Sequence, residues 1–232
     1  MFEYFYHEIL RKTVIGFGTL FNNVQIRKVD GTGKGISVMK VPLAYGPIQK
    51  FLARVEQAPD LKGAQTLTLP RLSFEFTGMS YDPSRKVTQT QTFLTAPTSD
   101  KTSARQVYMP VPYNMTFELN ALAKLNDDAL QMVEQILPYF QPSYNLNINL
   151  VSSIGEKRDV PIVLDSVSFT DDYEGDFSER RALIYTLTFT AKTYLFGPVP
   201  SASTGLIKKA TIDSVSYTHL RAHETEADLV CP

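Results

Sequence analysis

The amino-acid sequence predicts an α+β fold: a large, mostly antiparallel β-sheet with about three amphipathic helices. Many runs alternate between apolar and polar residues with a period of two, which is typical of half-buried strands. A few shorter segments repeat their apolar residues at helical spacing instead. The connections between these runs are rich in turn residues, which favours antiparallel neighbours over long crossovers.

The first predicted helix occupies the N-terminal residues up to Lys12 and then gives way to a strand. Residues 13–29 are rich in β-branched and aromatic side chains, which favours strand over helix. Gly16 and Gly18 are expected to bend that strand or to admit a close neighbour. The apolar residues at helical spacing are Phe2, Phe5, Tyr6, Ile9 and Leu10.

Two β-like runs, 24–29 and 36–41, flank the glycine-rich segment DGTGKG at 30–35. Glycine and aspartate supply the positive φ angles that hairpin turns need, so a β-hairpin is predicted. The alternative is a phosphate-binding loop. That loop requires a Gly-x4-Gly-Lys-Ser/Thr spacing, which is missing, and Ile36 stands where a hydroxyl would hold magnesium.

A second amphipathic helix is predicted from Pro47, a favoured first helical residue, to just before Pro59. A strand that is interrupted at Pro70 follows it. The apolar residues are Ile48, Phe51, Leu52 and Val55 in the helix, and Leu67, Leu69, Leu72, Phe74 and Phe76 in the strand. Residues 86–106 are rich in threonine and have little to bury, which predicts a loop or projecting arm.

The longest alternation of apolar and polar residues runs from 107 to 121 and predicts a strand. Because Pro110 and Pro112 have no N–H to donate, the first half of this strand is predicted to be a sheet edge. Three further strands are predicted nearer the C-terminus. They cover 146–150, 160–169 and 183–191.

The clearest helix begins at Asn126, the predicted N-cap. Asp127 and Asp128 follow it, and their charges suit the positive end of a helix dipole. Pro138 is expected to end or kink this helix. Its predicted apolar stripe consists of Ala129, Leu130, Val133, Ile136, Leu137 and Phe140.

Charge and composition exclude several classes of function. The 232 residues contain 23 Lys and Arg against 24 Asp and Glu, a formal net charge of −1, so there is no basic excess for nucleic-acid binding. No apolar run approaches the roughly 18 residues of a membrane span. The N-terminus lacks the features of a secretory signal, which predicts a protein made in a cytoplasm.

The segment 214–232 is expected to be foreign to the fold. From Val215 it reads VSYTHLRAHETEADLVCP, which resembles the in-frame translation of a sequencing adapter. The prediction is therefore a single domain over 1–213, with a tail that is not native, and the native C-terminus beyond Asp213 is left open. Without the tail the chain has no cysteine and one histidine, so it predicts no disulfide and no Cys/His metal site.

The search for catalytic chemistry yields no catalytic, cofactor-binding or metal-ligating residue. His7 is a lone histidine beside Glu8. The acidic stretch 171–176 departs from the EF-hand order, since Phe177 stands where that loop needs glycine when counting starts at Asp172. A pair of Asp or Glu carboxylates, as used by glycosidases, leaves no trace in a sequence. A tail-associated hydrolase with such a pair is therefore kept as the alternative.

Five long stretches of the chain resemble the tail sheath stabiliser and completion protein of contractile-tailed phages of the T-even type. The resemblance runs from about Phe2 to Val199, and its order and length make it more specific than any short motif. The stretches are FYHEILRKTVIGFGTLFNNV, KVPLAYGPIQKFLAR, LTLPRLSFEFTGMSYDPSRK, MPVPYNMTFELNALAKLNDDALQMVEQILPYFQPSYNLNINLV and DVPIVLDSVSFTDDYEGDFSERRALIYTLTFTAKTYLFGPV.

The resemblance implies a structural virion protein without enzymatic activity or cofactor. It implies a homohexameric ring at the head-proximal end of the tail, assembled in the host bacterial cytoplasm. The implied partners are further copies of the chain, the tail sheath protein, the tail tube terminator and a neck protein.

One charged turn is the predicted subunit or partner interface. Within residues 171–181, acids precede two adjacent arginines, which suits head-to-tail contacts with a neighbouring subunit. The alternative is a solvated hairpin tip. The residues concerned are Asp171, Asp172, Glu174, Asp176, Glu179, Arg180 and Arg181.

Overall fold

The computed structural model describes a subset of the chain. The described residues are 4–29, 35–51, 69–88, 90–96, 103–172, 182–199 and 204–205. The helices are α1 (Ile9–Leu20) and α3 (Asn126–Ile136), with 3-10 turns at η1 (Pro83–Arg85) and η2 (Leu137–Tyr139). The strands are β1 (Gln25–Val29), β2 (Gly35–Lys40), β3 (Leu43–Tyr45), β4 (Arg71–Tyr81), β5 (Thr92–Thr95), β6 (Ser103–Tyr108), β7 (Val111–Ala123), β8 (Ser143–Val151), β9 (Glu156–Asp172), β10 (Ala182–Leu195) and β11 (Thr204–Gly205).

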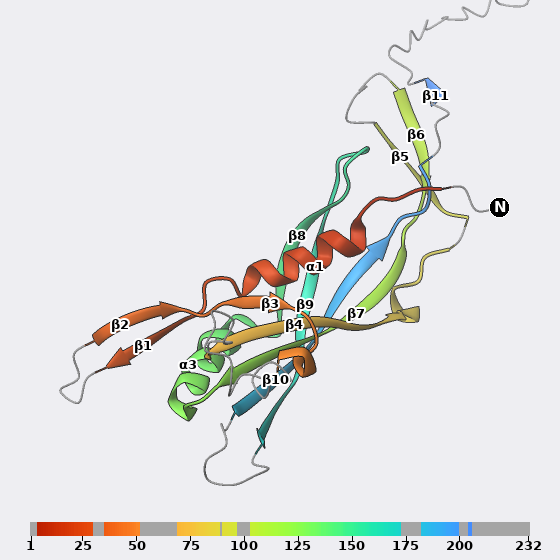
Figure 1. The fold of residues 1–232 in the computed structure, drawn as a ribbon. Helices are drawn as coiled ribbons and strands as arrows, with labels where there is room; N and C mark the ends of the chain where they lie inside the picture. Colours follow the sequence, from red (N-terminus) through yellow and green to blue (C-terminus); the bar gives the residue numbers. More distant parts are fainter. Residues whose placement is uncertain are drawn as a thin grey trace, which may run out of the picture.

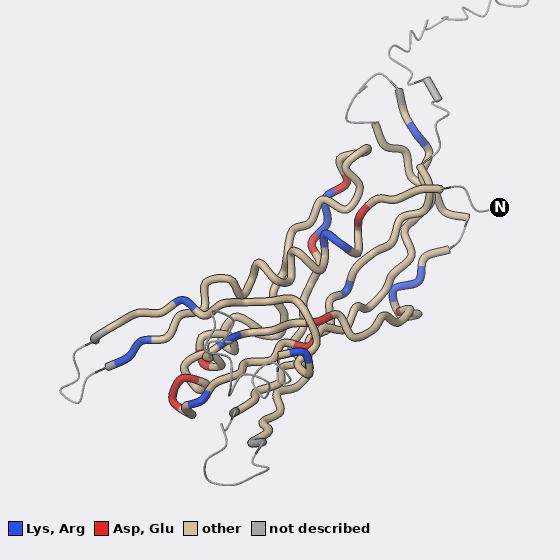
Figure 2. The backbone as a smooth tube through the Cα atoms, in the orientation of Figure 1, with Lys and Arg blue, Asp and Glu red and all other residues tan. Residues whose placement is uncertain are grey.

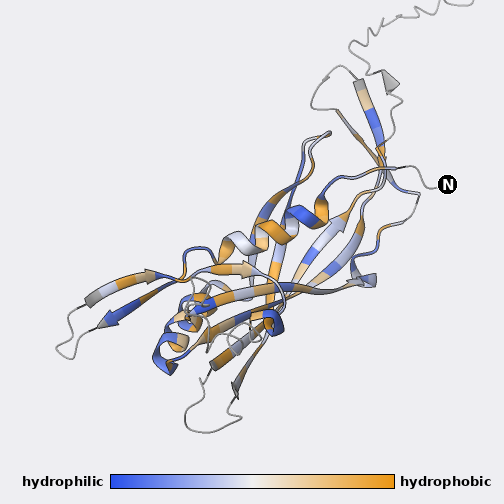
Figure 3. Cartoon of the chain, viewed as in Figure 1, coloured by the Kyte–Doolittle hydropathy of each residue, from blue (hydrophilic) through white to orange (hydrophobic). Residues whose placement is uncertain are grey.

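A six-stranded sheet in the order β3-β4-β7-β10-β9-β8 forms the centre of the fold (Figure 1). All of its pairs are antiparallel except β3 with β4. Along the long strands hydrophobic and hydrophilic residues alternate, as Figure 3 shows. The predicted α+β class with a large, mostly antiparallel sheet is therefore confirmed.

Helix α1 corrects the prediction for the N-terminal region. The helix covers Ile9–Leu20, whereas the sequence predicted a helix that ends near Lys12 and a strand after it. Ile9, Thr13 and Phe17 recur every fourth residue and are buried, so tertiary packing overrides the strand preference of this segment. A Cβ added to Gly18 would lie 2.6 Å from Cζ of Phe74, which shows why a small residue is needed in this helix.

An aromatic core joins α1 to the sheet. The ring of Phe17 stacks on that of Phe117 in β7 at 4.4 Å, and it makes an edge contact with Phe189 of β10 at 5.3 Å. All three side chains are fully buried. Phe140 extends the core, with its centroid 5.0 Å from that of Phe189. This side of the sheet is the hydrophobic centre of the protein.

Strands β1 and β2 form the predicted hairpin, which projects from one end of the molecule (Figure 1). Its turn, 30–34, lies outside the described residues. Two glutamines of α3 hold the outer edge of β1. Gln131 accepts from the Arg27 N–H at 3.0 Å and donates to the Arg27 carbonyl at 3.2 Å. Gln135 makes the same pair of bonds with Gln25, at 3.2 and 2.6 Å.

Helix α3 agrees with its prediction in position and differs in detail. It begins at Asn126, with Leu125 rather than Asn126 as the N-cap. Met132 is fully buried, whereas Leu130, which was assigned to the apolar stripe, is 47% exposed. The helix ends as predicted before Pro138, where η2 continues the chain. Of the second predicted helix, residues 48–51 are described and are helical.

Strand β7 is central rather than an edge, which corrects the prediction drawn from its prolines. Pro112 lies opposite Tyr194 of β10, and β4 pairs with β7 from Tyr113 onward. Pro112 stands near the start of the strand, where a missing donor is tolerated, and its carbonyl accepts from the Asp82 N–H at 3.2 Å. Within 86–106, where a loop or arm was predicted, β5 and part of β6 form a paired hairpin.

Candidate interaction surfaces

The side of the central sheet opposite the aromatic core is largely polar, apart from the buried pair of Leu122 in β7 and Ile184 in β10. Along β7 and β10 the residues between the core positions point to this side, because side chains alternate along a strand. We call this side the polar face. It is formed by Ser73, Glu75, Glu118, Asn120, Ser166, Ser168, Thr186, Thr188 and Thr190.

Two carboxylates lie side by side on the polar face. Glu75 of β4 is the direct cross-strand neighbour of Glu118 of β7. Burial, with a smaller contribution from the Glu118 charge, raises the pKa of Glu75 above its ordinary value. Asn120 donates to Glu118 Oε1 at 3.1 Å and accepts from the Thr186 hydroxyl at 2.7 Å. No ion pair joins either glutamate to a cation among the described residues.

The hydroxyl of Ser73 is a further unsatisfied group on the polar face. Ser73 lies two residues before Glu75 and opposite Asn120, and it is fully buried. Its Oγ has no hydrogen-bond partner. The polar face therefore combines two like charges with an unpartnered hydroxyl.

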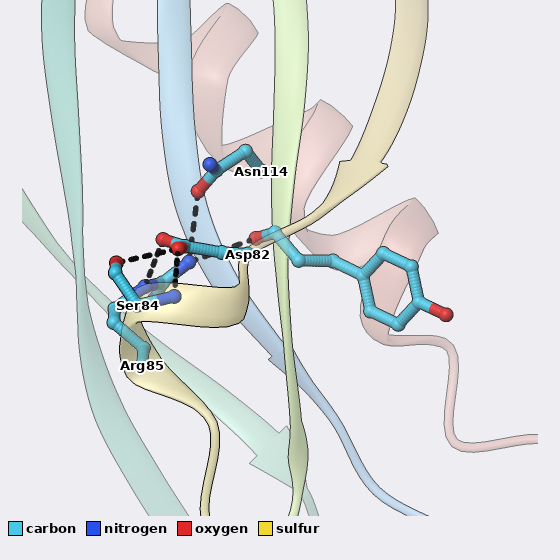
Figure 4. A network of polar contacts seen from close by, with 5 residues as sticks. Asp82, Ser84, Arg85 and Asn114 are labelled. Atoms are coloured by element: carbon cyan, nitrogen blue, oxygen red, sulfur yellow. Dashed lines mark hydrogen bonds and ion pairs between the residues drawn. The ribbon is translucent and has the colours of Figure 1, made fainter.

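A second polar cluster closes the far end of β4 (Figure 4). Asp82 accepts from the Ser84 N–H at 3.0 Å, from the Ser84 hydroxyl at 2.6 Å and from Arg85 Nε at 2.7 Å. Arg85 Nη2 donates to Asn114 Oδ1 at 2.8 Å. The hydrogen bonds from Ser84 and Arg85 hold the pKa of Asp82 well below its ordinary value. All of these polar groups are satisfied within the chain, so the cluster is structural.

Two guanidinium groups lie near the ring of Tyr194 at the same end of the sheet. Arg85 lies 5.0 Å from the ring centroid and Arg158 lies 5.1 Å from it. Arg158 Nε also pairs with Glu156 Oε1 at 2.8 Å. Cation–π contacts of this kind fix the guanidinium planes, so these two arginines are held by their own chain.

The predicted interface at 171–181 falls mostly outside the described residues. Asp171 and Asp172 end β9, where their backbones lie opposite Leu183 and Ala182 of β10. The remaining residues of the prediction are not described. They are Glu174, Asp176, Glu179, Arg180 and Arg181. Next to this turn, Val167 and Phe169 expose 42% and 50% of their surfaces.

The described part of the chain offers little to catalysis. A groove of about 500 Å³ lies between the ends of α1 and α3 and the start of β8. Glu134 is the single acid that lines it, so it does not hold a carboxylate pair. His7 donates to the Gly197 carbonyl at 2.9 Å and anchors the N-terminal segment. Within the described ranges no group of three metal-binding side chains occurs, and no helix is long and apolar enough to cross a membrane.

Sequence reasoning missed the Glu75–Glu118 pair. The two residues are far apart in the chain, and only the register of β4 against β7 brings them together. It also missed Gln131 and Gln135. Their spacing of one helical turn places both amides on one side of α3, yet nothing in the sequence shows that a strand edge lies there.

Comparison with known proteins gives two findings. A family model described as T4-like virus Myoviridae tail sheath stabiliser matches residues 4–230. The tail completion protein gp15 of Enterobacteria phage T4 is 32% identical over 222 residues. That similarity covers 92% of this chain and 79% of the relative.

Proposed function

The chain belongs to the tail sheath stabiliser family of T4-like viruses, and we propose that it forms a ring at the head-proximal end of a contractile tail. The family and the relative are structural tail proteins, so this chain is a structural protein of the virion tail and not an enzyme. The tail-associated hydrolase, which was the alternative, is therefore set aside. The observation that carries the proposal is the family match, which extends over almost the whole chain.

The proposed ring is a homohexamer that stabilises the sheath and joins the tail to the neck. Its proposed partners are the tail sheath protein, the tail tube terminator and a neck protein, and its assembly takes place in the host cytoplasm. The shape of the chain supports head-to-tail association. The β1–β2 hairpin and the small sheet of β5, β6 and β11 project at opposite ends of the central sheet (Figure 1).

The charged turn 171–181 is the first proposed subunit contact. In a head-to-tail ring its acids would face basic groups of the next copy, and Arg180 and Arg181 would pair with carboxylates of the copy before it. The exposed Val167 and Phe169 beside the turn would add apolar surface to this contact. Because a ring repeats the same contact at each junction, weakening it acts at every junction at once.

Particle mass measured by light scattering over a range of concentrations tests the ring. We expect the mass to exceed that of one chain at micromolar concentration, and a strict monomer at high concentration and low salt would contradict the proposal. The variant Arg180→Glu with Arg181→Glu tests the turn. It should lower the particle mass and leave the monomer folded, whereas rings with unchanged mass and salt sensitivity would rule out this contact.

A further inference from the structure

One face of the β1–β2 hairpin is basic and exposed. Cross-strand partners share a face, so Arg27 lies beside Val38, and Lys40 lies diagonally from Arg27 next to Gln25. Arg27 and Lys40 are exposed, and Val38 exposes 59% of its surface between them. The described residues of the two strands contain no carboxylate, and no ion pair reaches either cation within the described chain. Figure 2 shows Lys and Arg, in blue, on both strands of the projecting hairpin.

The hairpin is held rigidly and away from the polar face. Gln131 and Gln135 fix the backbone of β1 to α3, and the Val41 N–H donates to the Val24 carbonyl at 2.9 Å at the base. From this base the strands run outward from the body (Figure 1). Glu75 and Glu118 lie within β4 and β7, inside the central sheet. The basic face of the hairpin is thus exposed and lies away from the two glutamates of its own chain.

Among the described residues, no cation forms an ion pair with the two glutamates of the polar face. Glu75 and Glu118 are half-buried cross-strand neighbours without an ion-pair partner among the described residues. Like charges directly opposite one another destabilise a sheet. The unpartnered hydroxyl of Ser73 lies beside them on the same face and is fully buried. Arg71, on the same side of β4, stacks over Phe51 at 5.7 Å instead of neutralising the pair.

We propose that the Arg27–Lys40 face of the hairpin of one copy docks on the Glu75–Glu118 pair of the neighbouring copy. Diagonal residues such as Arg27 and Lys40 lie about 7–8 Å apart on a sheet, and direct cross-strand neighbours such as Glu75 and Glu118 lie about 5 Å apart, a difference that the long Arg and Lys side chains can span. The guanidinium fork of Arg27 suits a carboxylate, and Lys40 supplies the second positive charge.

A second copy is the occupant that charge complementarity favours. The contact joins two different surfaces of the same chain, so it is heterologous and can repeat around a ring. The two cations neutralise the two carboxylates, and the site is incomplete without the neighbouring copy. This inference rests on the self-association in the proposed function and is independent of the turn at 171–181.

Charge reversal on each side of the contact tests the inference. One variant carries Arg27→Glu with Lys40→Glu, and the other carries Glu75→Lys with Glu118→Lys. Sedimentation velocity measures the assembly of each variant alone and of an equimolar mixture. Each variant alone should assemble at least ten-fold more weakly than the unmodified chain, because like charges then meet at every junction. The mixture should restore assembly, because the acidic hairpin of one variant meets the basic pair of the other.

The controls separate this inference from the proposed ring. Arg11→Glu reverses an exposed charge on α1 and should leave assembly unchanged. If the lysine variant does not fold, as judged by circular dichroism, Glu75→Gln with Glu118→Gln takes its place and should still weaken assembly. Normal assembly of both variants would overturn this contact and leave the ring intact. Loss of assembly without restoration in the mixture would also overturn the contact, because charge complementarity then does not explain the loss. A monomeric unmodified chain would overturn the ring itself.

Discussion

The two sides of the central sheet are built from alternate residues of the same strands. They differ in whether their side chains find partners within the described chain. In β7, Phe117 enters the aromatic core and stacks on Phe17, whereas the next residue, Glu118, lies beside Glu75 on the polar face. The aromatic core buries its residues among partners of the same chain. The polar face leaves the Ser73 hydroxyl without a hydrogen-bond partner, and its two glutamates have no ion-pair partner among the described residues.

This difference separates the residues that stabilise the fold from those available for recognition. A fully buried aromatic side chain contributes several kcal/mol to stability, whereas a cross-strand polar pair contributes less than about 1 kcal/mol. The aromatic core therefore has little freedom to change, because each removal leaves a cavity. The polar face can carry a small energetic cost in the free chain, which the proposed contact with a neighbouring copy would relieve.

The largest effect is expected on the aromatic-core side, from Phe17→Ala. The substitution removes a fully buried ring that contacts Phe74, Phe117 and Phe189. It should lower the free energy of unfolding by about 3–5 kcal/mol, measured by urea denaturation. The control is Ile15→Ala on the same helix, where the side chain is 55% exposed and a change within about 0.5 kcal/mol is expected. Equal losses in both variants would contradict the role of Phe17.

On the same side of the sheet, Gly18→Ala should lower the free energy of unfolding by less than Phe17→Ala does. The added Cβ would lie 2.6 Å from Cζ of Phe74, and overpacking of this kind outweighs the gain of about 1 kcal/mol in helix propensity. We expect a net loss of about 1–2 kcal/mol in urea denaturation. Gly78→Ala is the matched control, because nothing lies within 4 Å of its Cβ position. A stabilising Gly18→Ala would show that the ring of Phe74 moves aside freely.

At the end of β4, Asp82→Asn should change how stability depends on acid. The pKa of Asp82 is lowered in the folded chain, so its carboxylate stabilises the fold above about pH 4 and loses this effect as the pH falls further. The variant should be less stable at neutral pH and should lose less stability on acidification. Thermal unfolding between pH 2 and pH 7 measures this, and parallel curves for the two proteins would contradict it.

On the polar face, Glu75→Gln should raise the stability of the chain slightly, whereas Asp82→Asn lowers it. The pKa of Glu75 is raised, so the folded chain holds its proton more firmly and stability decreases as the pH rises above about 4. Removing the charge should stabilise the free chain at pH 7 by less than about 1 kcal/mol, and salt should reduce the gain. Glu134→Gln, at an exposed position of α3, is the control. Destabilisation by Glu75→Gln would show that the carboxylate has a favourable partner.

The smallest effect is expected from deleting residues 214–232. If this segment is foreign to the fold, neither side of the sheet depends on it, and the melting temperature should stay within experimental error. The family match extends to residue 230, past the expected boundary at 213, so the deletion tests that boundary directly. A loss of several degrees would show that the segment packs against the domain.

The sequence predicted the strands well because alternation along β7, β8, β9 and β10 reflects one buried side. It failed at Thr13–Leu20, where β-branched and aromatic residues favour a strand but burial at every fourth position produces a helix. It also placed Leu130 on the buried side of α3, where the structure has Met132. Both residues are apolar, and which side of the helix is buried depends on its tertiary contacts. Periodicity thus identifies an element more reliably than the side that it buries.

The candidate contacts were harder to predict than the fold. The turn 171–181 was predicted as an interface because its charges are close together in the chain, and it stays a prediction. The pair of Glu75 and Glu118 depends on a strand register, which is a property of the folded sheet. The hydrogen bonds from Gln131 and Gln135 to β1 form only because α3 lies against the edge of that strand. Local patterns carry neither kind of information.

The grip of α3 on the hairpin also has a mechanical consequence. The side-chain amides of Gln131 and Gln135 form hydrogen bonds with backbone groups of β1. These bonds couple the orientation of the hairpin to that of α3. A force applied to the described strands of the hairpin would therefore act on α3, which contacts β7 and β10. The same bonds shield this strand edge from unwanted pairing with other chains.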